Sequence, residues 1–160
     1  MLAVYAAVFL DSLAISVVQL LQPYYALELG VTPDLLTMVT AAFTAAQFAG
    51  LAFWGRLSDR FGRRPALLAT LGGGAGASLL LLAVDSLPAF VAVRALAGFM
   101  SATALVATAC IADATAPERR ARGIASIGVA GGLGFIVGPI VGGHLAGTTG
   151  AGADFAAAFL

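Results

Sequence analysis

Long apolar runs alternate with short polar segments along the whole chain. Each complete run is close to the roughly 20 residues that an α-helix needs to cross the hydrocarbon core of a bilayer. A strand would leave backbone groups unpaired in lipid, so the runs predict helices. The pattern therefore predicts five complete transmembrane helices and the start of a sixth, at residues 2–22, 35–54, 66–84, 89–112, 123–146 and 155–160.

The composition supports the same interpretation. The chain is 61% hydrophobic and 10% charged, whereas a soluble domain has about 25% charged residues. The formal net charge is zero, so we expect no general attraction to nucleic acid. The sequence has no pattern of a nucleophile with its base and no set of metal ligands, so it gives no support for an enzyme, a cofactor or a bound metal.

The arginines predict the orientation in the membrane. All eight basic residues are arginine; four lie in residues 56–64 and three in residues 113–122. The polar segments between the other runs, at 23–34, 85–88 and 147–154, have no basic residue. By the positive-inside rule, the two arginine-rich segments and the N-terminus lie in the cytoplasm. We therefore expect a multi-pass protein of the bacterial inner (plasma) membrane.

The first arginine-rich segment has a regular internal spacing. It reads GRLSDRFGRR over residues 55–64. Asp59 and Arg63 are four residues apart and can meet if the helix before them continues that far, and Gly62 permits a tight turn. The simplest interpretation is a solvated arginine loop. The segment also resembles the signature between helices two and three of the major facilitator superfamily, at Gly55, Leu57, Ser58, Asp59, Arg60, Gly62, Arg63 and Arg64.

A second resemblance lies in the fifth run, which reads GGLGFIVGPIVGG over residues 131–143. Three glycines spaced by four residues share one helix face and allow another helix to approach closely. Pro139 removes one helical hydrogen bond. An ordinary packing face of small residues is the alternative. The run looks like the helix-five signature of antiporters in the same superfamily, at Gly134, Gly138, Pro139, Gly142 and Gly143.

The fourth run adds a weaker match. RALAG, residues 94–98, is similar to an Arg-x-x-x-Gly element of helix four in proton antiporters. Asp113, which follows this run, corresponds to an acidic residue that, by resemblance, pairs with an arginine of the first loop. The resemblance implies that Asp59, Arg63 and Asp113 form a latch that holds two helical bundles together on the cytoplasmic side.

Two charges fall inside the apolar runs. Asp11 lies about halfway along the first run, and Arg94 lies about two turns into the fourth. Ionisable groups at such depth are costly and usually functional. By resemblance, both helices face a central cavity, and the two residues are candidates for proton coupling. The alternative is that Asp11 only bonds a neighbouring helix and that Arg94 extends outward to the interface.

Three glutamines are further candidates. Gln19, Gln22 and Gln47 can line a cavity or bond a neighbouring helix, and the sequence does not separate the two roles.

The resemblance implies an all-α membrane fold: the N-terminal six-helix bundle of a twelve-helix carrier, with substrate bound between the bundles. It favours proton-coupled efflux of small amphipathic compounds by an antiporter. The alternatives are a sugar or metabolite exporter of the same superfamily and a non-transporting membrane scaffold. Because the last run ends after six residues, we expect this chain to be a fragment whose partner is the C-terminal bundle of the same polypeptide.

Overall fold

The computed structural model describes residues 2–28, 33–81, 83–84 and 86–148, and these contain helices and no strand. The helices are α1 (Leu2–Glu28), α2 (Pro33–Phe61), α3 (Arg63–Leu81), α4 (Leu87–Met100), α5 (Thr103–Ala114) and α6 (Pro117–Thr148). The predicted sixth span, 155–160, lies outside the described residues. The predicted all-α class is confirmed.

Four segments of the described residues are long and apolar enough to cross a membrane: Leu2–Leu20, Leu35–Phe61, Leu87–Ala114 and Pro117–His144. α3 covers most of the predicted run 66–84 but has 19 residues and carries Arg63 and Arg64 at its start, so its apolar stretch is shorter. Large side chains such as Met38, Phe48 and Ile136 remain exposed, as expected for a surface that faces lipid rather than water.

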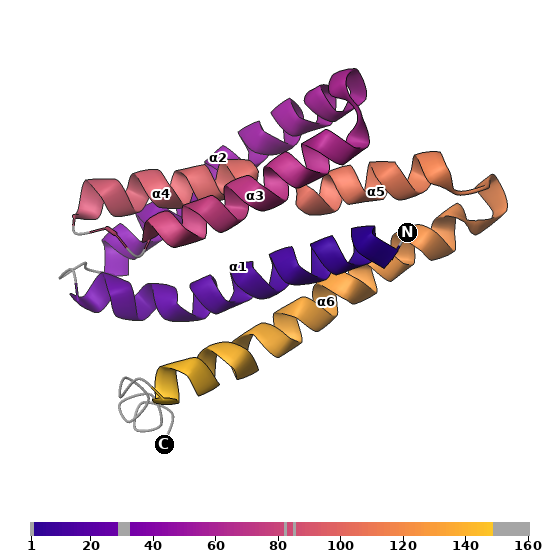
Figure 1. Cartoon of the computed structure of the whole chain (residues 1–160). Helices are drawn as coiled ribbons and strands as arrows, with labels where there is room; N and C mark the ends of the chain where they lie inside the picture. The colour runs from indigo at the N-terminus through magenta and orange to yellow at the C-terminus, as the bar shows by residue number, and fades with distance from the viewer. Residues whose placement is uncertain (1, 29–32, 82, 85, 149–160) are drawn as a thin grey trace.

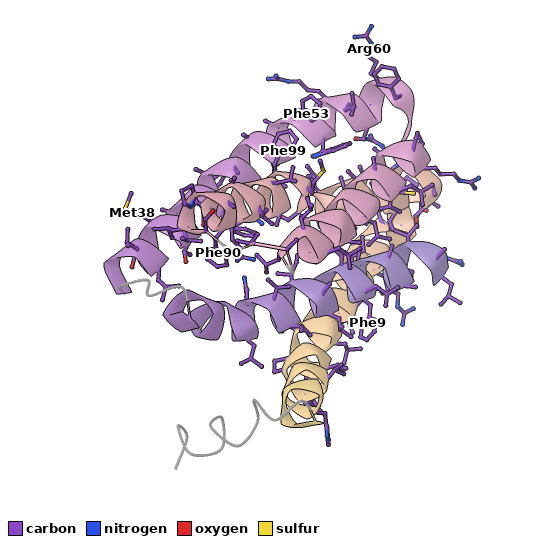
Figure 2. The ribbon with its side chains drawn as sticks, turned by 60° about the vertical axis from the view of Figure 1, so that its left-hand side comes forward. Phe9, Met38, Phe53, Arg60, Phe90 and Phe99 are labelled. Atoms are coloured by element: carbon purple, nitrogen blue, oxygen red, sulfur yellow. The ribbon has the colours of Figure 1, made fainter. Side chains whose placement is uncertain are left out.

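The helices form a bundle in which α1 lies along α6 and α2 lies along α4 (Figure 1). Small apolar clusters tie these pairs together. Val8, Ile111 and Ile127 join α1, α5 and α6, while Val39 and Phe90 join α2 and α4. Figure 2 shows Phe90 among the helices and Met38 pointing away from them.

The turn between α2 and α3 is made by one glycine. Gly62 has a φ of 97°, a left-handed conformation that residues with a Cβ rarely adopt. Its N–H donates to the Ser58 carbonyl over 3.1 Å, which closes the end of α2. α2 therefore continues past the predicted boundary at residue 54 to Phe61. This turn and the α5–α6 turn lie at the same end of the bundle (Figure 1), so the two arginine-rich segments share one side.

The predicted fourth span is divided into α4 and α5 by a break at Ser101 and Ala102. Carbonyl groups at the end of α4 accept hydrogen bonds from side chains instead of from the next helical turn. The Ser101 hydroxyl donates to the Gly98 carbonyl over 3.0 Å, and the Trp54 indole N–H of α2 donates to the Phe99 carbonyl over 3.0 Å. These bonds satisfy backbone groups that lipid could not, so the break is stable inside the bundle.

Two glycines allow α2 and α4 to approach closely beside this break. A Cβ at Gly98 would collide with the Phe43 carbonyl oxygen, and a Cβ at Gly50 would collide with the Phe99 carbonyl oxygen. The two contacts are reciprocal, with one glycine on each helix. Close approach at small residues is the usual way in which membrane helices gain packing energy.

Candidate functional site

A cavity of about 260 Å³ lies between α1, α2, α3 and α4, and its wall is mostly apolar. Asp11 of α1 and Arg94 of α4 both line it, although 83 residues separate them in the sequence. Phe43, Ser78 and Ser101 contribute further parts of the wall. The structure thus brings the two charges of the apolar runs to one site.

Arg94 is almost completely buried, with 4% of its surface exposed. Its guanidinium carbon lies 4.7 Å from the centroid of the Phe43 ring, a distance typical of a cation–π contact. Its Nε atom is buried and has no hydrogen-bond partner. Arg94 therefore lies in the cavity wall and does not extend outward to the membrane interface.

Asp11 is half-buried on the opposite helix. On the α3 side, a Cβ added to Gly74 would lie 3.6 Å from the Asp11 Oδ1 atom. The described residues contain no ion pair between Asp11 and Arg94, so the two charges share a cavity without touching.

A second group of charges lies at the arginine-rich end. Arg63 Nε donates to Asp113 Oδ2 over 2.8 Å, and Arg63 Nη1 lies 2.5 Å from Asp59 Oδ1. Arg63 also donates to the Ser58 hydroxyl over 2.8 Å. The hydrogen bond to Asp113 and the contacts with Asp59 raise the pKa of Arg63. One arginine at the start of α3 therefore joins α2 to α5.

The other members of the loop signature play different parts. Arg60 and Arg64 are exposed, and Figure 2 shows Arg60 pointing away from the bundle. The guanidinium of Arg60 lies 5.5 Å from the ring centroid of Phe61. Gly55 lies against Leu105 of α5, since an added Cβ would be 3.8 Å from that side chain.

The glycine face of α6 packs on α1. A Cβ at Gly134 or Gly138 would collide with backbone or side-chain atoms of α1, and one at Gly142 would contact Val17 and Leu20. Gly143 faces open space. α6 continues through Pro139, and the Ser16 hydroxyl of α1 donates to the Phe135 carbonyl over 3.2 Å.

The structure distinguishes the positions of the three candidate glutamines. Gln47 Nε2 donates to the Ser101 hydroxyl over 2.9 Å, so its role is to bond the neighbouring helix at the break, and it is not part of the cavity wall. Gln19 is exposed and also lies outside that wall. The side chain of Gln22 lies outside the description.

Sequence reasoning missed several polar residues that bridge helices, namely Ser16, Trp54, Thr70, Ser101 and Thr103. Serine and threonine are common in membrane helices, where each hydroxyl can bond its own backbone or another helix. Their spacing alone does not show which of the two occurs.

Apolar helices that pack around a cavity lined by two charged side chains are typical of multi-pass membrane proteins. The family model described as Major Facilitator Superfamily matches residues 4–160, and the chain belongs to this family of transporters.

The relatives agree with this assignment. The chain is 34% identical over 137 residues to the class B tetracycline resistance protein of Escherichia coli, covering 84% of this chain and 34% of the relative. It is 38% identical over 108 residues to major facilitator superfamily domain-containing protein 10 of Bos taurus, covering 68% of this chain and 24% of the relative.

A solved structure also has the same fold. The human organic anion transporter MFSD10 (TETRAN) matches with a TM-score of 0.72 and 29% sequence identity, over 87% of this chain and 39% of that one. The predicted major facilitator fold is thereby confirmed. The chain spans about a quarter to two fifths of the length of these relatives.

Proposed function

We propose that the complete protein is a proton-coupled efflux carrier of small amphipathic compounds that works by alternating access. The observation that carries this proposal is the position of Asp11 and Arg94 on the wall of one small, mostly apolar cavity. Charged groups inside a membrane are costly and are retained mainly on the paths of ions and substrates.

The cavity suits one part of a small amphipathic molecule. Its volume of about 260 Å³ is just below the roughly 300–1,000 Å³ of typical small-molecule sites. In carriers built from repeats, substrate binds between two bundles near the membrane midplane. A second bundle beyond this chain would complete the site, while the Phe43 ring and the aliphatic wall would contact the apolar part of the substrate.

Asp11 is the group proposed to carry the proton. It would bind a proton when the cavity opens to the outside and release it inward when substrate binds. Loss of water favours the neutral form of a carboxyl group, whereas a nearby cation favours its charged form. Arg94, across the same cavity, supplies that cation without forming a fixed pair that would prevent Asp11 from being protonated.

Arg63, Asp59 and Asp113 are proposed to form the cytoplasmic latch. Their contacts already join α2, α3 and α5. In the outward-facing state this cluster would hold the bundle against its partner bundle. A bias of about 1–3 kcal/mol between the two states is the usual size of such a coupling. We place this end and the N-terminus in the cytoplasm of a bacterial cell.

The relatives support efflux over the alternatives. Tetracycline resistance proteins and a multidrug transporter of Aspergillus fumigatus are among them. A sugar or metabolite exporter of the same superfamily and a non-transporting scaffold remain as outcomes of the test.

The test uses everted membrane vesicles with an acidified interior that contain the protein expressed from its complete reading frame. Addition of the lipophilic cation tetraphenylphosphonium should release protons from the vesicles, because entry of the compound is exchanged for exit of protons. Vesicles without the protein provide the control. Proton release on addition of a sugar but not of tetraphenylphosphonium would favour the sugar or metabolite exporter. If neither a sugar nor any amphipathic compound caused proton release, the scaffold would be favoured.

A further inference from the structure

Arg94 has fewer partners than a buried cation needs. Among the side chains that the structure describes, it forms no ion pair, and its Nε atom is buried without a hydrogen-bond partner. A charged group taken out of water is costly unless it is paired and hydrogen-bonded. The cation–π contact with the Phe43 ring offsets only part of that cost. Arg94 therefore retains the capacity to bind an anionic oxygen.

The other polar side chains of the cavity wall have less to offer such an oxygen. Ser78 and Ser101 line the cavity, but each already donates its hydroxyl proton to a backbone carbonyl close in sequence, over 3.0 Å in both cases. The carboxylate of Asp11 can only accept. Within the described wall, Arg94 is thus the donor that remains for a bound molecule.

Asp11 gives the same cavity a place for a cation. It lines the wall from α1, and the described residues provide no ion pair for it. The wall therefore presents one positive and one negative group that do not neutralise each other, while most of the remaining wall is apolar.

We propose that the cavity selects zwitterionic amphipathic compounds, whose carboxylate binds the Arg94 guanidinium while their cationic group lies near Asp11. This inference rests on the proposed function and names the substrate class of the same site. A guanidinium is planar and binds a carboxylate through two parallel hydrogen bonds where the geometry permits. The Phe43 ring and the aliphatic wall contact the apolar part of the compound.

The proposal also fits the exchange of substrate for a proton. The cationic group of the substrate and the proton compete for Asp11, so binding of the zwitterion releases the proton. Tetraphenylphosphonium supplies only the cationic half of this arrangement. It remains a substrate, but it leaves Arg94 without an anion and is bound less tightly than a compound that has both groups.

The experiment compares two triphenylphosphonium compounds that differ at one end. Carboxybutyltriphenylphosphonium ends in a carboxylate, and pentyltriphenylphosphonium has a methyl group in its place. Their dissociation constants are measured at neutral pH by isothermal titration calorimetry on the complete protein in nanodiscs, with protein-free nanodiscs as the blank. The carboxylate compound should bind about tenfold more tightly, since it gains a charge-assisted hydrogen bond.

Variants of the two charged residues separate the two halves of the site. Arg94→Gln removes the charge and should bind both compounds equally. Arg94→Lys keeps the charge without the planar guanidinium and should keep part of the preference, and it provides the comparison if the glutamine protein does not fold. Asp11→Asn should weaken both compounds to the same extent, because both carry the phosphonium cation.

Arg64→Gln is the matched control. It makes the same change at an exposed arginine outside the cavity wall, so the preference for the carboxylate compound should be that of the wild type. A wild-type protein without the preference would overturn the proposal. The same preference in Arg94→Gln, Arg94→Lys and Arg64→Gln would overturn it as well.

The binding measurement needs no proton gradient and no transport, so this inference and the proposed function fail separately. A preference that depends on Arg94, in a protein that releases no protons when tetraphenylphosphonium is added, would leave the binding site and remove the carrier function. Proton release by tetraphenylphosphonium without any preference for the carboxylate compound would do the reverse.

Discussion

The Ser16 hydroxyl of α1 donates a hydrogen bond to the Phe135 carbonyl of α6, with 3.2 Å between the two oxygen atoms. Phe135 lies four residues before Pro139, which has no N–H to offer that carbonyl. Ser16 therefore supplies the donor that the proline removes. Gly134 and Gly138 make this possible, because side chains at either position would collide with α1.

This relationship predicts a compensating pair of variants. Ser16→Ala should lower the free energy of unfolding by about 1 kcal/mol, since a buried carbonyl loses its partner. In a Pro139→Ala background, the residue-139 N–H can bond Phe135 within the helix, so Ser16→Ala should cost clearly less. Thermal unfolding of the purified protein in detergent, compared across the four proteins of the cycle, measures the difference. Equal costs in both backgrounds would contradict the explanation.

Because α2 and α4 approach closely, we expect one added methyl group at their contact to lower the stability of the protein. Gly98→Ala places a Cβ against the Phe43 carbonyl oxygen, and the two backbones must separate. We expect a loss of about 1–3 kcal/mol in stability, seen as a lower unfolding temperature.

Gly72→Ala is the control for this prediction. Gly72 is exposed on α3, and nothing lies within 4 Å of an added Cβ. Its replacement should leave stability unchanged or slightly raised, because alanine favours helix over glycine. If Gly98→Ala were as stable as Gly72→Ala, the close packing of α2 on α4 would be wrong.

The latch predicts a change in transport without a change in insertion. Asp59→Asn and Asp113→Asn each remove one carboxylate from Arg63 and should lower the initial transport rate about fivefold, within the range of usual coupling energies. Stability should change little, because exposed ion pairs contribute about 0–1 kcal/mol. Arg64→Gln, which alters an exposed arginine outside the cluster, should transport normally. Transport at the wild-type rate by both aspartate variants would leave the loop as a topology signal only.

Local spacing predicted a large part of this structure. Asp59 and Arg63 meet because they are four residues apart near a helix end, a relationship that any reader of the sequence can derive. The glycine face of residues 134–142 was likewise visible as a repeat of four, although the sequence did not show that α1 is the helix that packs there.

The break at Ser101 and Ala102 could not be predicted in the same way. The run 89–112 has no proline, and Arg94 is its only charged residue. The break depends on Trp54 and Gln47, which come from another helix and donate hydrogen bonds to its edges. Tertiary partners, not local propensity, decide this feature.

Coupling through Asp11 is the central claim, and one comparison tests it directly. Asp11→Asn keeps the size of the side chain and removes its ability to bind and release a proton. In acidified everted vesicles that contain the complete protein, addition of tetraphenylphosphonium should release protons from the wild type. The Asp11→Asn protein, inserted at the same level, should release no more than vesicles that lack the protein. Proton release by the variant at the wild-type rate would remove Asp11 from the proton path and contradict the account.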